Sequence, residues 1–221
     1  MLQFDALGDQ AVLAHGSDET AALAFAAAVR EQHFSWVEDV VQAYSSVAIF
    51  YGPPISYAEA RRRLTTLDWQ SRAETHRGTL HVIPCCYALG LDFDRIAQHT
   101  DLTREQIIAT HTSAVYTVYA IGFCPGFPYL GYLPAALTGV PRLESPRLKV
   151  EAGSVGLTGR QTGIYTEARP GGWNIIGRTP LELVNVADGY FPIRTGDRVQ
   201  FQRIDEREFR DSAGKRLDVE R

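Results

Sequence analysis

The first 78 residues alternate between helix-like and strand-like patterns of hydrophobic positions. An Ala-rich run over 20–32 carries an apolar stripe at helical spacing, which predicts a helix. Residues 37–41 and 46–51 are rich in β-branched and aromatic side chains. They are joined at Tyr44-Ser45, and this pattern predicts two neighbouring strands.

A second helix is predicted to begin at Ser56. In Ser56-x-x-Glu59 the serine oxygen can accept from the backbone N–H of Glu59 while the glutamate reaches back, which is a capping box. This helix is expected to run to about residue 71. The polar stretch over 70–78 then predicts a linker.

Two further segments complete the pattern of the first domain. Residues 4–15 form a strand-like start interrupted at Gly8 and Asp9, and residues 80–84 have the composition of a strand. The resulting order β-α-β-β-α-β is typical of the split βαβ, or ferredoxin-like, arrangement. We therefore predict a ferredoxin-like α/β domain over residues 1–78.

The pattern changes after the linker. Two short helices are predicted over 92–100 and 102–113, the second with the capping box Thr103-x-x-Gln106. After this point no further helix is predicted, because short apolar runs alternate with glycine and proline. These runs cover residues 115–121, 155–157, 173–176, 181–186 and 199–201.

Such runs favour a small antiparallel β-barrel or sandwich over residues 79–221. The tail from about residue 205 is charged and interrupted by glycine, so we expect it to fray. The whole chain is thus predicted to be of the α+β class.

Composition narrows the functional classes. The 221 residues include 22 Lys and Arg against 26 Asp and Glu, a formal net charge of −4 that argues against a nucleic-acid-binding protein. No apolar run approaches the ~18 residues of a membrane span, and no signal-peptide pattern opens the sequence. Cys85, Cys86 and Cys124 make neither a disulfide framework nor a zinc motif. We therefore expect no metal site and a cytoplasmic location.

Candidate chemistry concentrates between residues 111 and 179. The run over 122–131 holds three glycines, two prolines and three aromatic residues, which predicts a rigid loop presenting Phe123, Phe127 and Tyr129. Such a loop forms either one wall of a binding site or a structural turn with a hydrophobic plug. Both interpretations stay open on these residues alone.

A glycine-rich stretch follows over 153–163. It lacks the Gly-Lys-Ser/Thr of a Walker A loop, and Ser154 is not in a nucleophile elbow, so Ser154 is interpreted as a hydrogen-bonding residue. The bare strand would let a ligand lie against the backbone. Trp173 is either a stacking platform or a core residue. Arg178 is either a fork for a carboxylate or phosphate or a surface residue.

His111 stands at the end of a predicted helix that leads into this run. A histidine there can act as acid or base near neutral pH, and it can equally be a helix-end residue bonded to a backbone carbonyl.

Taken in order, six motifs resemble the KipI / allophanate hydrolase subunit 1 family. The resemblance extends over nearly the whole chain. The motifs are His111-x4-Tyr116, the run from Gly122 to Leu130, Pro141-Arg142-x3-Pro146-Arg147, Gly153-Ser154-Val155-Gly156, Gln161-Thr162-Gly163-Ile164-Tyr165, and the run from Pro170 to Pro180.

This resemblance implies a ferredoxin-like domain followed by a cyclophilin-like antiparallel β-barrel. It also implies a subunit of an ATP-dependent 5-oxoprolinase, which opens 5-oxo-L-proline to L-glutamate. The implied partners are a PxpC-type (allophanate hydrolase subunit 2) protein and a PxpA-type protein. ATP with Mg²⁺ would be used by the complex, and the chain alone is expected to be inactive.

For this chemistry we hypothesise that His111 transfers a proton and that Gln161, with backbone N–H groups over 153–163, donates to the amide and oxyanion. The remaining candidates bind substrate. They are Phe123, Pro125, Gly126, Phe127, Tyr129, Arg142, Arg147, Ser154, Thr162, Tyr165, Gly172, Trp173 and Arg178.

The alternative function is a KipI-type regulatory protein that inhibits a sensor histidine kinase. A prolyl isomerase would rest on fold analogy alone. Urea carboxylation would need a biotin carboxylase domain that this sequence does not contain.

Overall fold

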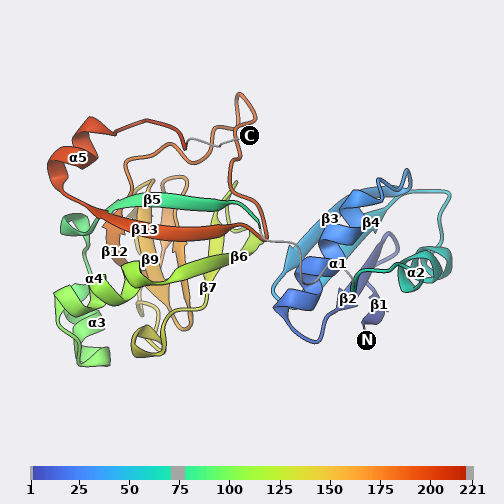
Figure 1. Ribbon diagram of the computed structural model, residues 1–221, viewed down its shortest axis with the longest axis horizontal. Helices are drawn as coiled ribbons and strands as arrows, with labels where there is room; N and C mark the ends of the chain where they lie inside the picture. The colour runs from blue at the N-terminus through green and yellow to red at the C-terminus, as the bar shows by residue number, and fades with distance from the viewer. Residues whose placement is uncertain (1, 71–77, 218–221) are drawn as a thin grey trace. The chain divides into compact units, whose positions relative to one another are not determined.

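The computed structural model describes residues 2–70 and 78–217. The chain divides into two compact units, Met1–Arg77 and Gly78–Arg221, and each is described by itself (Figure 1). The linker predicted over 70–78 lies almost wholly outside the described residues.

The first unit contains a four-stranded antiparallel sheet and two helices. Its sheet has the strand order β1-β2-β4-β3. Helix α1 buries Phe25 and Val29 against this sheet, so the predicted helix and the predicted pair of strands are both confirmed. The elements are β1 (Gln3–Ala6), β2 (Ala11–His15), α1 (Glu19–Glu31), β3 (Val37–Ala43), β4 (Ser46–Tyr51) and α2 (Tyr57–Thr65).

The fourth strand of this sheet is not the predicted one. The strand-like start is a hairpin of two strands, and β1 occupies the edge position beside β2. The strand predicted over 80–84 is β5 (Leu80–Cys86), which belongs to the second unit. Strand β4 does lie between β2 and β3, as a split βαβ requires. The ferredoxin-like assignment itself stays a prediction.

The capping box of α2 forms only in part. The Ser56 hydroxyl accepts from the Glu59 N–H at 3.3 Å, as predicted. The Glu59 carboxylate turns away to Arg62 and Arg63, at 2.8 and 2.7 Å. Hydrogen bonds between ionised partners are stronger than a bond to a neutral N–H, so the carboxylate keeps the arginines. The helix also ends at Thr65, before the predicted residue 71.

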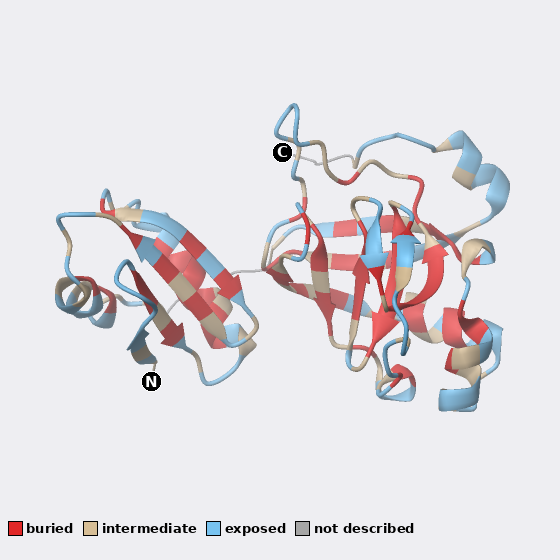
Figure 2. Ribbon diagram, turned by 180° about the vertical axis from the view of Figure 1, so that it is seen from behind, coloured by how far each residue is buried: buried red, intermediate tan, exposed pale blue. Residues whose placement is uncertain are grey.

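The second unit is a closed barrel of seven strands, β6-β13-β5-β12-β9-β10-β7, in which β7 pairs with β6. Figure 2 shows buried residues concentrated on these strands. The barrel strands are β5, β6 (Val115–Ile121), β7 (Pro128–Gly131), β9 (Ser154–Thr158), β10 (Gln161–Ile164), β12 (Asn174–Arg178) and β13 (Arg198–Ile204). Strands β8 (Arg147–Val150) and β11 (Arg169–Gly171) form a separate pair.

The prediction of a wholly antiparallel barrel is wrong at one seam. Strand β13 runs parallel to β5, from Arg198 beside Leu80 to Ile204 beside Cys86. A hairpin connection forces neighbouring strands to be antiparallel, but these two strands are the first and last of the unit. Nothing in the local sequence therefore sets their relative direction.

Helices lie at the ends of the barrel strands. Helices α3 (Phe93–Thr100) and α4 (Arg104–Ser113) confirm the predicted pair, and both bonds of the Thr103–Gln106 capping box are present. The expectation of a frayed tail without helix is wrong. Helix α5 (Glu206–Asp211) begins at Asp205, whose carboxylate caps the Glu208 N–H.

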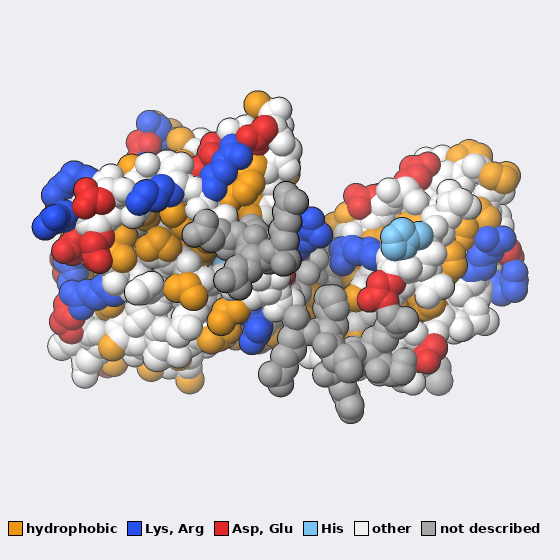
Figure 3. Space-filling view, turned by 45° about the horizontal axis from the view of Figure 1, so that its top comes forward, with side chains coloured by type: hydrophobic (Ala, Val, Ile, Leu, Met, Phe, Trp, Pro, Cys, Tyr) orange, Lys and Arg blue, Asp and Glu red, His pale blue; other side chains and the backbone are white. Residues whose placement is uncertain are grey.

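The apolar run over 181–186 is not a strand. It makes only isolated bridges, Glu182 with Arg216 and Asn185 with Tyr190, although Leu183 is buried. Within the described part of the chain, no helix is long and apolar enough to cross a membrane. On the face shown in Figure 3, basic and acidic side chains are mixed over the second unit.

Candidate functional site

The loop after β6 is held by its own backbone. The Gly122 N–H donates to the Phe127 carbonyl at 3.1 Å, and the Phe127 N–H donates to the Cys124 carbonyl at 3.1 Å. Phe123 lies in the left-handed region at φ 65°, which is unusual for a residue with a side chain, and 59% of it is exposed. The loop is therefore the rigid presenting segment that its composition predicts.

The structure brings five of the residues predicted to bind substrate together in an aromatic cluster. Phe127 lies at its centre, with ring centroids 4.9 Å from Tyr129, 5.4 Å from Tyr165 and 5.5 Å from Trp173. Phe123 packs edge-on against Phe127 at 5.4 Å. Phe127, Tyr165 and Trp173 are buried, whereas Tyr129 is partly exposed. These edge-to-face pairs give the cluster a fixed geometry.

Glycines on β9 and β10 make room for this cluster. A Cβ atom on Gly163 would lie 3.0 Å from the rings of both Phe127 and Trp173. The Gly153 N–H donates to the Tyr165 carbonyl at 2.6 Å, and β9 and β10 pair with each other. The strand predicted to be bare is thus covered by the protein's own rings. The N–H groups of β9 and β10 lie within this paired ladder, and their role as oxyanion donors stays a prediction.

Arg142 and Arg147 are close enough to the cluster for their charges to act on Tyr165. The Arg147 Nη2 donates to the Asp92 carboxylate at 2.6 Å, while its Nη1 is buried without a hydrogen-bond partner in the described structure. The Arg95 Nη2 donates to the Arg142 carbonyl at 3.2 Å. Among residues 2–70 and 78–217, no carboxylate forms an ion pair with the exposed Arg142.

The positive charge of Arg142 affects the pKa values of two tyrosines in the aromatic cluster. Burial raises the pKa of Tyr129, and the Arg142 guanidinium partly opposes that rise. Burial also raises the pKa of Tyr165, with the same opposition from Arg142. Both phenols therefore stay protonated at neutral pH, and each has a proton that it can donate.

Gly172 helps to hold the segment that carries Arg142. Its carbonyl accepts from the Leu143 N–H at 2.8 Å, which fastens the segment that carries Arg142 beside the cluster. Residues Asp92, Arg95 and Asn174 belong to the same framework and were not singled out from the sequence. Asn174 is fully buried and accepts from Arg95 Nε at 3.1 Å. The position of Asp92 at the start of the helix predicted over 92–100 was the one available signal.

His111 lies in the barrel core, away from the aromatic cluster. The ring is 0% exposed and contacts Phe201 at a centroid distance of 4.6 Å. Its Nδ1 accepts from the Tyr87 hydroxyl at 2.8 Å. The Thr162 hydroxyl donates to the Gly156 carbonyl at 2.9 Å, so it must accept from His111 Nε2–H at 3.0 Å.

This environment determines the charge of His111. Burial lowers the pKa of the ring to about 3, so the imidazole is neutral at physiological pH. The ring has no open surface from which it reaches a ligand. The proton-transfer role of His111 therefore stays a prediction, and its observed role is to bond Thr162 of β10.

The other predicted residues are dispersed. Gln161 is partly exposed on β10, Ser154 is buried on β9, and Pro125 is exposed while Gly126 packs against Val184. Arg178 is separate from the aromatic cluster, because its Nε donates to the Ala152 carbonyl at 2.8 Å. In the described part of the chain, no group of three or more His, Cys, Asp or Glu side chains is placed to hold a metal ion.

Comparison with known proteins agrees with the motifs. Residues 2–189 match the family model of the carboxyltransferase domain, subdomain C and D. The 5-oxoprolinase B subunit of Bacillus subtilis is 34% identical over 228 residues, covering 94% of this chain and 95% of that protein. The 5-oxoprolinase B subunit of Escherichia coli O157:H7 is 40% identical over 169 residues, covering 75% of this chain and 77% of that protein.

A solved structure shows the same fold in a longer chain. The crystal structure of TTHA0988 superposes with a TM-score of 0.78 at 32% identity over 89% of this chain. The present chain spans 40% of the length of TTHA0988. The resemblance predicted from the motifs is confirmed, and the chain belongs to the family of the carboxyltransferase domain, subdomain C and D, together with the 5-oxoprolinase B subunits.

Proposed function

We propose that this chain is a subunit of an ATP-dependent 5-oxoprolinase, which opens 5-oxo-L-proline to L-glutamate. The similarity over nearly the full length of the 5-oxoprolinase B subunit of Bacillus subtilis carries this proposal. The geometry of the aromatic cluster supports it, because a flat ring with a carboxylate needs an apolar surface beside a cation.

The substrate would lie across the exposed part of the aromatic cluster. Arg142, which has no carboxylate partner among the described residues, would bind the substrate carboxylate. Tyr129 stays protonated because burial raises its pKa, so its hydroxyl would donate to the ring carbonyl. A donor at that oxygen stabilises the negative charge that develops as the lactam is attacked.

A second arginine, Arg147, is suited to bind a phosphate. Arg147 keeps one nitrogen on Asp92, and its other terminal nitrogen is a buried donor without a partner in the described structure. Such an orphaned donor suits an anionic oxygen. When bound to the complex, ATP with Mg²⁺ would supply the phosphate that activates the lactam oxygen. Ligands for the metal would come from the phosphates or a partner, since no metal cluster lies in the described residues.

Partner chains would complete the site. The cluster presents one arginine and one phenol at an open surface, and His111 lies in the core. We therefore propose a PxpC-type and a PxpA-type partner in the cytoplasm, with no turnover by this chain alone. His111 would then position β10 through Thr162.

The test is reconstitution with the two partner types and an assay of 5-oxo-L-proline cleavage that depends on ATP. Replacing Arg142 with alanine should raise KM at least 10-fold, because a charged hydrogen bond contributes about 1.5–3 kcal/mol. Arg61→Ala, an exposed arginine of α2, is the matched control and should leave KM unchanged.

Two outcomes would contradict the proposal. Equal KM values for Arg142→Ala and the control would remove Arg142 from the substrate site. A complex that assembles without cleaving 5-oxo-L-proline, from a chain that instead binds a kinase dimerisation domain, would favour the KipI-type regulatory function.

A further inference from the structure

A cavity lies in the second unit, apart from the aromatic cluster. It has a volume of 360 Å³, opens to solvent, and lies between the segment that follows β12 and the C-terminal segment that follows β13. None of its lining residues belongs to the aromatic cluster. Its size lies near the lower end of the ~300–1,000 Å³ typical of small-molecule sites.

The walls of this cavity are mainly apolar. Pro180, Leu181 and Leu183 follow β12 on one side, and Phe209 of α5 with Ala213 lies on the other. Leu183 is buried and Phe209 is partly exposed. Such walls suit a short aliphatic body.

One cation faces this apolar space. The Arg178 Nε is held by the Ala152 carbonyl at 2.8 Å, which leaves the terminal nitrogens of the guanidinium for a further partner. No ion pair joins Arg178 to a carboxylate among the described residues. Its guanidinium carbon lies 6.0 Å from the centre of the Phe209 ring, so the cation belongs to the cavity wall.

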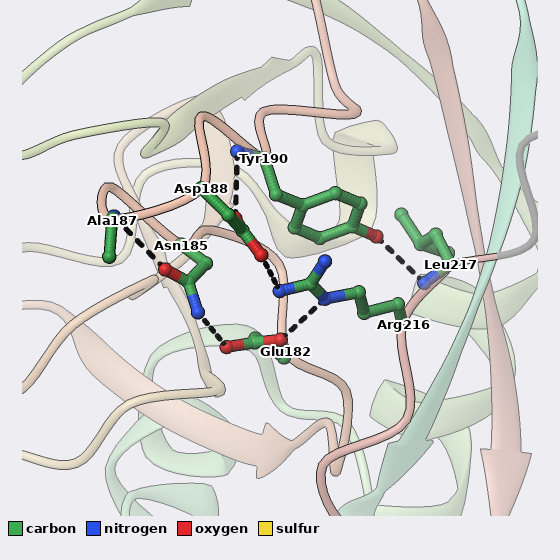
Figure 4. Close-up of polar contacts among 7 residues, drawn as sticks. All are labelled: Glu182, Asn185, Ala187, Asp188, Tyr190, Arg216 and Leu217. Carbon is green, nitrogen blue, oxygen red and sulfur yellow. Dashed lines mark hydrogen bonds and ion pairs between the residues drawn. The ribbon is translucent and has the colours of Figure 1, made fainter.

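The one acid that lines the cavity is already committed. Glu182 accepts from Arg216 Nε at 2.7 Å and from Asn185 Nδ2 at 2.8 Å, so both of its carboxylate oxygens are already bonded (Figure 4). Figure 4 also shows Asp188 bonded to the same arginine. Arg178 is therefore the charged side chain of the lining that keeps donors for a ligand.

Two hydroxyls complete the polar part of the lining. The Thr166 hydroxyl donates its proton to the Pro125 carbonyl at 2.7 Å, so this hydroxyl can only accept a hydrogen bond from a ligand. Thr179 Oγ1 accepts from the Leu181 N–H at 3.4 Å and keeps its own proton to donate. A guanidinium and one hydroxyl donor match a single carboxylate, whereas a phosphate would need more donors.

The cavity wall formed by the C-terminal segment is held in place by the same arginine, Arg216, and by two backbone N–H groups. The Arg216 guanidinium lies 4.4 Å from the centre of the Tyr190 ring, and the Leu217 N–H donates to the Tyr190 hydroxyl at 2.9 Å. The Gly214 N–H donates to the Pro180 carbonyl at 3.0 Å. The C-terminal segment is thus fixed over the cavity, and the site is preformed.

We infer that this cavity is a binding site for a small aliphatic carboxylate, with Arg178 as its anchor. The site is separate from the surface proposed for 5-oxo-L-proline and does not depend on that function. Its failure would leave the proposed function untouched.

The experiment is isothermal titration calorimetry of the full chain with valerate at constant ionic strength. Two probes test its chemistry, 1-pentanol for the apolar body alone and inorganic phosphate for charge alone. Valerate should bind saturably, and each of the other probes at least 10-fold more weakly. Arg178→Gln should weaken valerate binding at least 10-fold, whereas Arg160→Ala should not change it. Arg160 is an exposed arginine stacked 4.5 Å from the Tyr132 ring centre and does not line the cavity.

A second variant protects the test against misfolding. Ala213→Leu adds bulk from the exposed C-terminal segment without touching Arg178, and it should abolish valerate binding with an unchanged circular dichroism spectrum. The inference is overturned if valerate does not bind, if Arg178→Gln binds it equally well, or if phosphate binds at least as tightly as valerate.

Discussion

At the scale of single residues, burial decides what a side chain can do. His111 has the residue type of an acid–base catalyst, but its neutral ring bonds Tyr87 on one side and Thr162 on the other. Arg142 and Arg147 come from one motif, yet only Arg147 has a carboxylate partner among the described residues. The same residue types therefore differ in function because of their surroundings.

The buried histidine should make stability depend on pH. Burial lowers the pKa of His111 from 6.5 to about 3, so below pH 6.5 the unfolded chain binds a proton that the folded chain does not. This contribution to stability is present above pH 6.5 and is lost as pH falls toward 3. His111→Gln should reduce the pH slope of the free energy of unfolding by up to about 1.4 kcal/mol per pH unit.

Urea unfolding of both proteins at intervals between pH 4 and 6.5 measures these slopes. The other titrating groups are the same in the two chains, so they cancel in the comparison. Parallel curves would show that His111 is protonated in the folded protein.

Removing the Tyr129 hydroxyl should lower the rate of catalysis and leave the stability of the fold nearly unchanged. Tyr129 is partly exposed and its ring packs against Phe127 and Trp173, contacts that phenylalanine would keep. In the reconstituted complex, Tyr129→Phe should lower kcat about 10-fold by removing a donor to the developing charge, with a change in unfolding free energy below about 0.5 kcal/mol. An unchanged kcat would exclude Tyr129 as that donor.

At the scale of elements, the glycines of β9 and β10 make room for aromatic side chains. Strands β9 and β10 pair throughout, and their glycines admit the rings of Trp173 and Phe127. The loop over 122–127 then covers the same patch, so the glycine-rich stretch and the aromatic loop form one unit of packing.

Crowding that patch should destabilise the fold. A Cβ on Gly163 would lie 3.0 Å from two aromatic rings and 2.9 Å from the Pro128 carbonyl oxygen. Gly163→Ala should cost about 1–3 kcal/mol of unfolding free energy through overpacking. Gly122→Ala, whose Cβ would meet Tyr129 at an ordinary 3.8 Å, is the control and should cost less than about 1 kcal/mol. Equal effects in thermal unfolding would contradict this account.

At the scale of the whole molecule, the second unit has a closed barrel with its own core. Tyr116, Leu130, Ile164 and Phe201 meet inside it from strands that are distant in sequence. The barrel closes only because β13 lies between β5 and β6. The last strand is therefore as important for closure as the first.

Truncation tests this dependence. Residues 78–221 expressed alone should unfold cooperatively on heating, because their core and barrel contacts are internal to the unit. Residues 78–197, which lack β13, should show no cooperative transition. The account fails if the shorter fragment unfolds as sharply as the longer one.

Local patterns anticipated much of this protein. Helices α1, α3 and α4 lie where apolar stripes and caps predicted them, because a helix is specified by contacts between near neighbours. The rigidity of the loop over 122–127 follows from its own glycines and prolines. The six motifs in order identified the family. What local patterns missed was α5, a short helix whose Asp205 cap lies in a charged stretch without a buried face.

Only the tertiary structure decided the rest. The direction of β13 beside β5, the burial of His111 and the pairing of Arg147 with Asp92 each join residues far apart in the chain. Their energies depend on burial and charge in the folded protein, and a local pattern contains neither. The sequence by itself thus determined most of the elements, the family and the residue types near the candidate site. The fold decided which of those residues are exposed and which are buried in the barrel.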